Sequence, residues 1–299
     1  MKTLNLNQIC SSTTTADVPL GVVADCNNLD ILSDNRTSIS DVSIHVSDLI
    51  KADPTTAFCP REYYLHFHTK RQFPPRKVSP GMDLVFYSGT AIHDKTVKTF
   101  IANSPFGKYV YGKWTCKCGH KKFVGYKPNG PAYICPRCCT LADNYNELDV
   151  HNAKYGISAH PDLLILYRGI LYLYEIKTFD RKGLNFDNIE TPFGDHKLQA
   201  GCYYKLLQEM GYKVYKGVRF IYVDRSTSKV FFGRPFKELE WSPENSAEYE
   251  TVNKLLGLAE TTATAIRTKQ VPVRCCTDPF CERAKHCAVS SLCFNLKKG

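Results

Sequence analysis

One segment near the middle of the chain restricts the fold more than any other: two apolar runs joined by a tight turn. It covers residues 157–178, and Arg168-Gly169 separates the two runs. Short apolar runs bounded by turn residues are typical of strands buried in a sheet. A two-residue connection that contains glycine is typical of a β-hairpin. We therefore expect a buried hairpin over this segment.

Charged residues stand at the same end of both predicted strands. Glu175 and Lys177 are two positions apart and so project from one face of their strand. Pairing about the turn would bring Asp162 close to Glu175. Buried charges are costly unless they pair or hold a metal, and two carboxylates on a divalent ion can activate water against a phosphodiester. The pattern indicates a site for Mg or Mn, although an acid-x-lysine triplet is also common at exposed strand ends.

Length and charge narrow the class of protein. The 299 residues can form one large domain, or one domain with inserts. Lysine and arginine exceed aspartate and glutamate by 39 − 29 = 10. This balance favours an anionic partner, most often nucleic acid. There is no secretory signal near the start and no apolar run long enough to span a bilayer, so we expect an intracellular, reducing compartment and no membrane partner.

Helical periodicity gives one of the predicted helices a functional face. In that helix His93, Val97 and Phe100 share one side, so His93 should point toward the core. Further helices and strands follow from similar patterns. The expected helices cover most of 41–70, then 88–102, 195–210 and 244–268, and the further expected strands cover 217–223 and 229–233.

The helix expected at 195–210 has recognisable end signals. Asp195 is a plausible N-cap, and Gly211 is a plausible stop.

Cysteines form clusters, which in a reducing compartment indicates metal binding rather than disulfides. Within residues 111–146, Cys116-Lys-Cys118 and Cys135-Pro-Arg-Cys138 resemble the two knuckles of a zinc ribbon. The first knuckle has a one-residue spacer where two are usual, so His120 or Cys139 could replace one of these ligands. The basic residues of this module could grip DNA or form a solvated surface: Lys113, Lys117, Lys121, Lys122 and Arg137.

The order of these signals resembles the RecB-like branch of the PD-(D/E)XK nuclease superfamily, in particular the CRISPR-associated RecB-like and AddB-type iron–sulfur exonucleases. The resemblance spans about residues 55–295, and its Gln-x-x-x-Tyr element is the mark of the RecB branch. The matching pieces are Gly89-Thr-Ala-Ile-His93, His160-Pro161-Asp162, Glu175-Ile176-Lys177 and Gln199-Ala-Gly-Cys-Tyr203.

The resemblance implies a fold and a set of roles. The fold is an α/β restriction-endonuclease-like core, a mixed sheet flanked by helices, with an inserted zinc ribbon and an iron–sulfur clasp that joins the ends. Lys177 would orient or help to deprotonate the attacking water, and Gln199 and Tyr203, one helical turn apart, would lie beside it. Outside this constellation His93 and Tyr203 would read as ordinary core residues. The implied ligands of Mg or Mn are His93, Asp162, Glu175 and the carbonyl of Ile176.

A 4Fe–4S cluster is also implied by the resemblance, with one cysteine before the core and three after it. The implied ligands are Cys59, Cys281, Cys287 and Cys293. The gap between Cys281 and Cys287 is wider than in those families, so Cys275 or Cys276 could replace Cys281. A zinc site, or partly spare thiols, are the alternatives.

These features divide the chain into parts. We expect a polar arm at 1–40, a nuclease core at 41–110 and 147–270, the zinc-ribbon module at 111–146, and a cysteine-rich tail at 271–299 that completes the cluster with Cys59.

The expected function is that of a metal-dependent DNA exonuclease that acts on single strands or DNA ends, in recombination, replication or DNA processing. A helicase, integrase or recombination partner is possible, since the sequence contains no Gly-x-x-x-x-Gly-Lys-Ser/Thr loop of its own. The alternative is a non-catalytic or partner-dependent nucleic-acid-binding protein with a zinc ribbon. Basic and aromatic residues that could contact DNA are Tyr63, Lys70, Arg71, Lys121 and Lys122.

Overall fold

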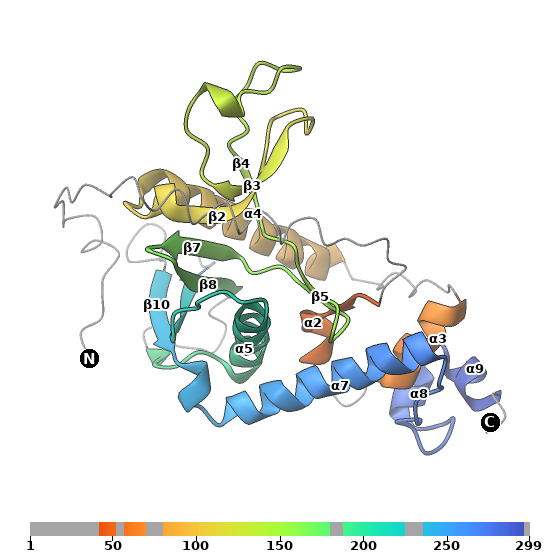
Figure 1. The fold of residues 1–299 in the computed structure, drawn as a ribbon. Helices are drawn as coiled ribbons and strands as arrows, with labels where there is room; N and C mark the ends of the chain where they lie inside the picture. Colours follow the sequence, from red (N-terminus) through yellow and green to blue (C-terminus); the bar gives the residue numbers. More distant parts are fainter. Residues whose placement is uncertain (1–41, 52–56, 70–79, 180–187, 225–235, 296–299) are drawn as a thin grey trace.

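The structure, a computed structural model, describes residues 42–51, 57–69, 80–179, 188–224 and 236–295 (Figure 1). Two sheets and several helices form the described part. The strands are β1 Ile44–His45, β2 Val110–Thr115, β3 Lys122–Tyr126, β4 Asn144–Asn146, β5 Val150–Asn152, β6 Ile157–Ala159, β7 Leu163–Tyr167, β8 Ile170–Phe179, β9 Val218–Asp224 and β10 Phe236–Trp241. The α-helices are α2 Val46–Leu49, α3 Pro60–Thr69, α4 Pro80–Asn103, α5 Gly194–Glu209, α7 Glu248–Thr268, α8 Glu282–His286 and α9 Ser290–Asn295, with short 3-10 turns at Gly107–Tyr109, Pro131–Tyr133 and Pro243–Asn245.

The main sheet is mixed. Its strands follow the order β10-β9-β8-β7-β2-β3, and β4 pairs with β2 beside this path. The β8–β9 pair is parallel, and the other pairs are antiparallel. The predicted hairpin is present as β7 and β8, with a left-handed φ of 51° at Arg168 and 74° at Gly169, as a tight hairpin turn requires.

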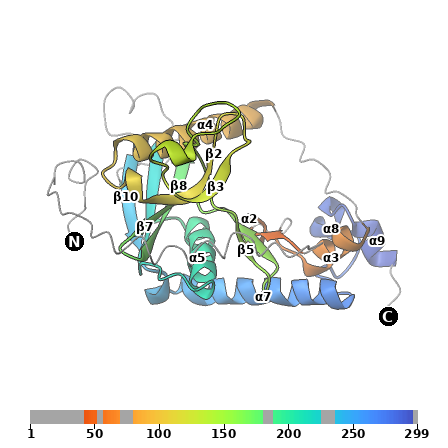
Figure 2. The same cartoon turned by 45° about the horizontal axis from the view of Figure 1, so that its top comes forward.

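Helices cover both faces of this sheet. On one face α4 packs Val97, Phe100 and Ile101 against Leu163 and Ile176 of the hairpin. On the other face lies α5, with α7 beyond it, as both views show (Figures 1 and 2). The expected α/β fold, a mixed sheet flanked by helices, is confirmed.

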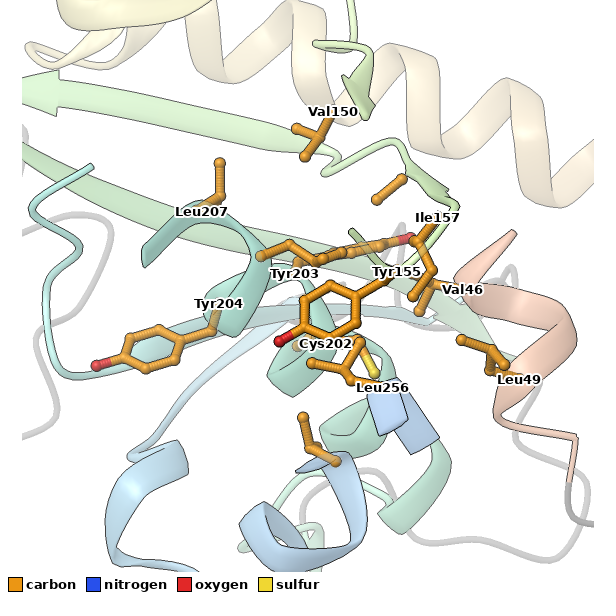
Figure 3. Close-up of a cluster of buried hydrophobic side chains, with 14 of the residues drawn as sticks. Val46, Leu49, Val150, Tyr155, Ile157, Cys202, Tyr203, Tyr204, Leu207 and Leu256 are labelled. Atoms are coloured by element: carbon orange, nitrogen blue, oxygen red, sulfur yellow. The ribbon is translucent and has the colours of Figure 1, made fainter. Parts of the chain in front are cut away.

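A second, small sheet closes the core beside α5. Its order is β1-β6-β5, with β1 parallel to β6. Its apolar residues and those of α2 pack against α5 and α7 (Figure 3). The members of this contact include Val46, Leu49, Val150, Ile157, Cys202, Tyr204, Leu207 and Leu256.

Several predicted boundaries differ from the structure. The helix expected at 88–102 begins earlier, at Pro80, and part of the region expected to be helical at 41–70 is strand β1. Residues Ile157–Ala159 belong to the small sheet rather than to the hairpin, because His160-Pro161-Asp162 interrupts the run and proline cannot donate to a ladder. The strand expected at 229–233 lies outside the described residues, and β10 is a partner of β9.

The N-cap prediction for α5 was wrong. Phe193, not Asp195, is the N-cap, and its carbonyl accepts a hydrogen bond from Lys197 N at 2.9 Å. Tertiary contacts fix this start, because Phe193 N donates to the Tyr222 hydroxyl at 3.1 Å. The predicted stop is confirmed: α5 ends at Glu209, and Gly211 follows with φ +89°.

The cysteine module shares a strand with the core. Val110 and Tyr111 of β2 pair with β7, whereas Lys113 to Thr115 of the same strand pair with β3 and β4. The expected boundary near residue 111 therefore cuts through a strand. The expected arm at 1–40 lies outside the described residues.

At the far end of α7, segments from both ends of the described chain meet. Helices α3, α8 and α9 gather there (Figures 1 and 2). Arg61 donates to the Pro272 carbonyl at 3.0 Å, and Arg283 donates to the Ala57 carbonyl. These contacts tie residues more than 200 positions apart.

Candidate metal and active site

The hairpin register places the two motif acids side by side. Leu163 pairs with Tyr174, so Asp162, one residue before β7, comes level with Glu175 of β8. Asp162 Oδ2 accepts a hydrogen bond from the backbone N of Ile176 at 2.6 Å. The predicted convergence of Asp162 and Glu175 is therefore present. Ile176 contributes its N–H to Asp162, while its side chain is buried on the α4 face.

His93 reaches this point from α4, as its helical face predicted. Its Nε2 lies 3.3 Å from Asp162 Oδ1 and 4.0 Å from Glu147 Oε1. His93, Glu147 and Asp162 each offer one ligand atom, and these atoms all lie within 4.8 Å of one another. The set can hold a metal ion. Glu147 was not among the residues singled out in the sequence.

Glu175 lies deeper than this triad and is not part of that close set. Its side chain is fully buried, and its Oε1 lies 2.6 Å from Lys177 Nζ in an ion pair. Neither its two oxygens nor His93 Nε2 has a hydrogen bond of good geometry within the described residues. Buried oxygen and nitrogen atoms with unused lone pairs, drawn from carboxylates and an imidazole, suit a divalent ion such as Mg or Mn.

The pKa shifts at this site indicate an excess of negative charge. Burial, and then the charge of Asp162, raise the pKa of Glu175 to about 8 and that of Glu147 to about 7. Burial alone would lower the pKa of His93, but the carboxylates of Asp162 and Glu147 raise it to about 9. Groups that raise each other's pKa in this way are stabilised when a cation is added.

A chain of hydrogen bonds links Lys177 to α5. Lys177 Nζ donates to Gln199 Oε1 at 2.8 Å, and Gln199 Nε2 donates to the Tyr203 hydroxyl at 2.7 Å. Burial would lower the pKa of Lys177, but Glu175 and Asp162 together raise it, so the ammonium stays charged. The structure thus brings together all three residues predicted to lie around the attacking group.

His196 of α5, which the sequence did not single out, is near enough to Lys177 to respond to its charge. His196 Nδ1 is 2.8 Å from the Tyr222 hydroxyl. Since this hydroxyl accepts from Phe193 N, it can donate its own proton to His196. Burial, and then the positive charge of Lys177, lower the pKa of His196 to about 4. His196 is therefore neutral at pH 7. A lone histidine after Asp195 gives no sequence signal of this role.

The four predicted module cysteines converge. Cys116, Cys118, Cys135 and Cys138 place their sulfurs within 4.8 Å of one another, and this cluster could hold a metal ion. Cys116 Sγ also accepts a hydrogen bond from Lys121 N at 3.2 Å. The alternative ligands His120 and Cys139 are exposed and do not belong to the set.

The terminal cysteines line one pocket. Cys59, Cys287 and Cys293, three of the four implied cluster ligands, surround it together with Cys275 and Cys276. Cys281 does not line the pocket. Its Sγ instead accepts from Ala284 N at 3.4 Å as the N-cap of α8. Cys275 and Cys276, the alternatives to Cys281, both line the pocket, and the Cys281 thiol interacts with that of Cys276.

The residues suggested to contact DNA have different surroundings in the structure. Tyr63 is partly buried, donates to Asp48 Oδ2 at 2.5 Å and packs on Phe58, so it has a structural role. Lys121 donates to the Ala132 carbonyl within the module, whereas Lys122 is exposed on β3. Lys70 and Arg71 lie outside the described residues. Among the helices of the described part, none combines the length and the apolar character that crossing a membrane would need.

Comparison with known proteins adds little. No family model matches the sequence, and no curated protein matches it. A solved structure described as "Crystal structure of SSO0001" has 17% sequence identity to this chain and a TM-score of 0.37. The match covers 91% of this chain and 96% of the other. At that TM-score the likeness supports no conclusion about function.

Proposed function

We propose that the chain is a Mg- or Mn-dependent DNA exonuclease of the RecB-like PD-(D/E)XK type. One observation carries the proposal: His93, Asp162 and Glu175 converge at one end of the hairpin, with the Lys177 ammonium beside them. The net charge of +10 supports a polyanionic substrate. Single-stranded DNA and DNA ends are the proposed substrates.

In this proposal the protein's residues have separate tasks. His93, Asp162 and Glu175 hold the ion, and the Ile176 carbonyl is a further ligand. A bound Mg or Mn supplies water activation and charge neutralisation at phosphorus. Lys177, which stays protonated, orients the water and stabilises the charge that develops on the phosphate. Gln199 and Tyr203 hold the ammonium in place through the hydrogen-bond chain from α5.

For the module cysteines we propose zinc. Tetrahedral Zn–S bonds of about 2.3 Å correspond to sulfur–sulfur separations of about 3.8 Å. The sulfur of Cys118 lies 3.5 Å from that of Cys116 and 3.8 Å from that of Cys135. Such a closed set of four thiolates, each used as a ligand, indicates a structural site rather than a catalytic one.

For the terminal pocket we propose a 4Fe–4S cluster held by Cys59, Cys287, Cys293 and either Cys275 or Cys276. Five cysteines around one pocket exceed what a single zinc would need. The Cys59 thiolate is favoured already, because a hydrogen bond from Cys275 lowers the pKa of Cys59 to about 6. The cluster would fasten α3 to the tail that carries α8 and α9.

The test is cleavage of end-labelled single-stranded DNA by anaerobically purified protein with Mn, Mg or EDTA. Lys177→Ala should lose about a hundredfold or more in rate, since it removes a group that stabilises the transition state. Lys254→Ala, an exposed lysine paired only with Glu250 among the contacts described, is the matched control and should cleave normally.

Release of labelled mononucleotides or short fragments from one end would support exonuclease action. Undiminished cleavage by Lys177→Ala would refute the assigned site. Tight DNA binding without cleavage by any metal-loaded wild type would favour the non-catalytic alternative.

A further inference from the structure

Glu147 comes to the candidate metal site from the cysteine module rather than from the hairpin. It directly follows β4, the strand by which the chain leaves the module. Its Oε1 is 4.0 Å from His93 Nε2, and its ligand atom lies within 4.8 Å of that of Asp162. The side chain is half-buried, with 36% exposed.

Two groups beside Glu147 carry buried polar atoms that a cation could satisfy. His93 Nε2 lies between the carboxylates of Asp162 and Glu147, is inaccessible to solvent, and makes no hydrogen bond in the described structure. Glu175 is fully buried behind it: its Oε1 is ion-paired with Lys177 Nζ at 2.6 Å, whereas its Oε2 has no partner in the described residues. A cation at this place would satisfy these atoms, and Glu147 is positioned to join them.

The position of Glu147 depends on β4. Trp114 of β2 pairs with Tyr145 of β4, and their rings meet edge to face with centroids 5.3 Å apart. The Tyr145 hydroxyl donates to the carbonyl of Asp162 at 3.1 Å. One residue of β4 is thus anchored to the hairpin at Asp162, two positions before Glu147.

The thiol cluster lies where β2 ends and just before β4 begins. Cys116 directly follows β2, and Ala142, two residues before β4, is buried in one small cluster with Cys116 and Cys135. A metal on the thiols would therefore hold the end of β2 and the beginning of β4 together. Loss of this metal would remove the constraint on the beginning of β4.

We infer that Glu147 is an additional ligand of the divalent ion, delivered by the cysteine module, and that the metal on the four thiols is needed to keep it there. The inference rests on the proposed metal site of His93, Asp162 and Glu175. On this inference the module is part of the active site rather than a separate DNA-binding element.

The test measures Mn binding, not activity, so that it stands apart from the nuclease assay. Free Mn is followed by electron paramagnetic resonance during titration of the full-length protein. Loss of a partner of a bound metal typically lowers affinity about 10–100-fold. Glu147→Gln should weaken Mn binding by about tenfold or more. Asp143→Asn changes an exposed acid directly before β4. It is the matched control and should bind Mn like the wild type.

A third variant separates the two proposals. If Asp162→Asn weakens Mn binding and Glu147→Gln does not, the inference is overturned and the nuclease site survives. If neither variant changes Mn binding, or the wild type binds no Mn, the proposed metal site itself is wrong.

The dependence on the thiol metal is tested by a double-mutant cycle. Cys138→Ser should weaken Mn binding about as much as Glu147→Gln does, and the double variant should be no weaker than either. Additive losses would overturn the dependence. Since Cys138→Ser could unfold the module, removal of the thiol metal from wild type by a chelator, followed by Mn titration, gives the same comparison without a mutation.

Discussion

At the scale of single residues, Lys177 influences two titratable neighbours in different ways: Glu175 forms an ion pair with it, and His196 is kept neutral. The buried carboxylate of Glu175 is 2.6 Å from its ammonium, and the charge of Lys177 helps to keep His196 neutral. The neutral ring accepts a hydrogen bond from Tyr222 and adds no positive charge beside Lys177. The ammonium therefore remains directed toward the carboxylates and Gln199.

The depressed pKa of His196 predicts a pH effect on stability. Between its folded value of about 4 and an unfolded value of about 6.5, the unfolded chain binds a proton that the folded chain does not. The stabilising contribution is therefore present above the unfolded pKa and is lost as the pH falls toward 4, by roughly 2–3 kcal/mol. His196→Asn, which can still accept from Tyr222, should flatten this part of the stability profile.

The measurement is urea unfolding of wild type and variant from pH 7 to 4.5, compared as a difference. His120→Asn, a change of an exposed histidine, should keep the wild-type slope. Equal slopes for wild type and His196→Asn would contradict the assignment of a neutral, buried His196.

The sequence predicts the Asp162–Glu175 approach because the two-residue period of strands and the turn fix the register locally. The face of His93 follows from helical periodicity in the same way. Glu147 could not be found, since its position depends on the pairing of Lys113 with Asn146, 33 residues later, through a module with no apolar pattern. Long-range register of this kind leaves no local signal.

At the scale of elements, strand β2 joins core and module, and its middle permits only a small residue. A Cβ on Gly112 would lie 2.4 Å from Tyr145 Cε2 and 3.2 Å from the Asn146 carbonyl oxygen. The Tyr145 ring is held between Trp114 and the Asp162 carbonyl, so it has no room to move away. The close approach of β4 to β2 therefore requires glycine.

Gly112→Ala should lower the free energy of unfolding by about 1–3 kcal/mol, as overpacking does in a filled core. Gly257→Ala is the control. It lies in α7 with open space around its Cβ position, and should raise stability by about 0.5–1 kcal/mol through helix propensity. Urea unfolding at pH 7 compares the three proteins. A Gly112→Ala protein as stable as wild type would mean that β4 can shift freely on β2.

The elements predicted best are those with a complete local pattern, such as α5, α7 and the hairpin. The start of α5 was misplaced because Phe193 is held by Tyr222, a contact 29 residues away, and this outweighs the capping preference of Asp195. Strand β6 was assigned to the hairpin because its apolar run gives no sign of which sheet it joins. Tertiary pairing decides both cases.

At the scale of the whole molecule, the terminal pocket stands apart from the sheet. Helix α7 has 21 residues, about 30 Å of length, and its far end meets α3. Arg61 and Arg283 already tie the two ends of the described chain by hydrogen bonds to backbone carbonyls. The proposed cluster would add a covalent link to these contacts.

Cys59→Ala should reduce iron and acid-labile sulfide from about four atoms each per chain to near zero, because Cys59, directly before α3, is the pocket-lining cysteine that does not come from the tail. Cys281→Ala should retain both, since Cys281 lies outside the pocket lining. Cys202→Ala, which changes a buried thiol of α5, is a second control. Iron retained by Cys59→Ala and lost by Cys281→Ala would restore the ligand set that the resemblance implied.

The packing of Trp114 has a spectroscopic consequence. The chain has two tryptophans, Trp114 and Trp241. Trp114 belongs to the core under α4, and Trp241, at the end of β10, belongs to the core under α5 and α7. Their indoles lie on strands near opposite edges of the sheet. Replacing one at a time by phenylalanine would leave a single fluorophore on each side, so that the emission of one reports on the module half and that of the other on the helical half.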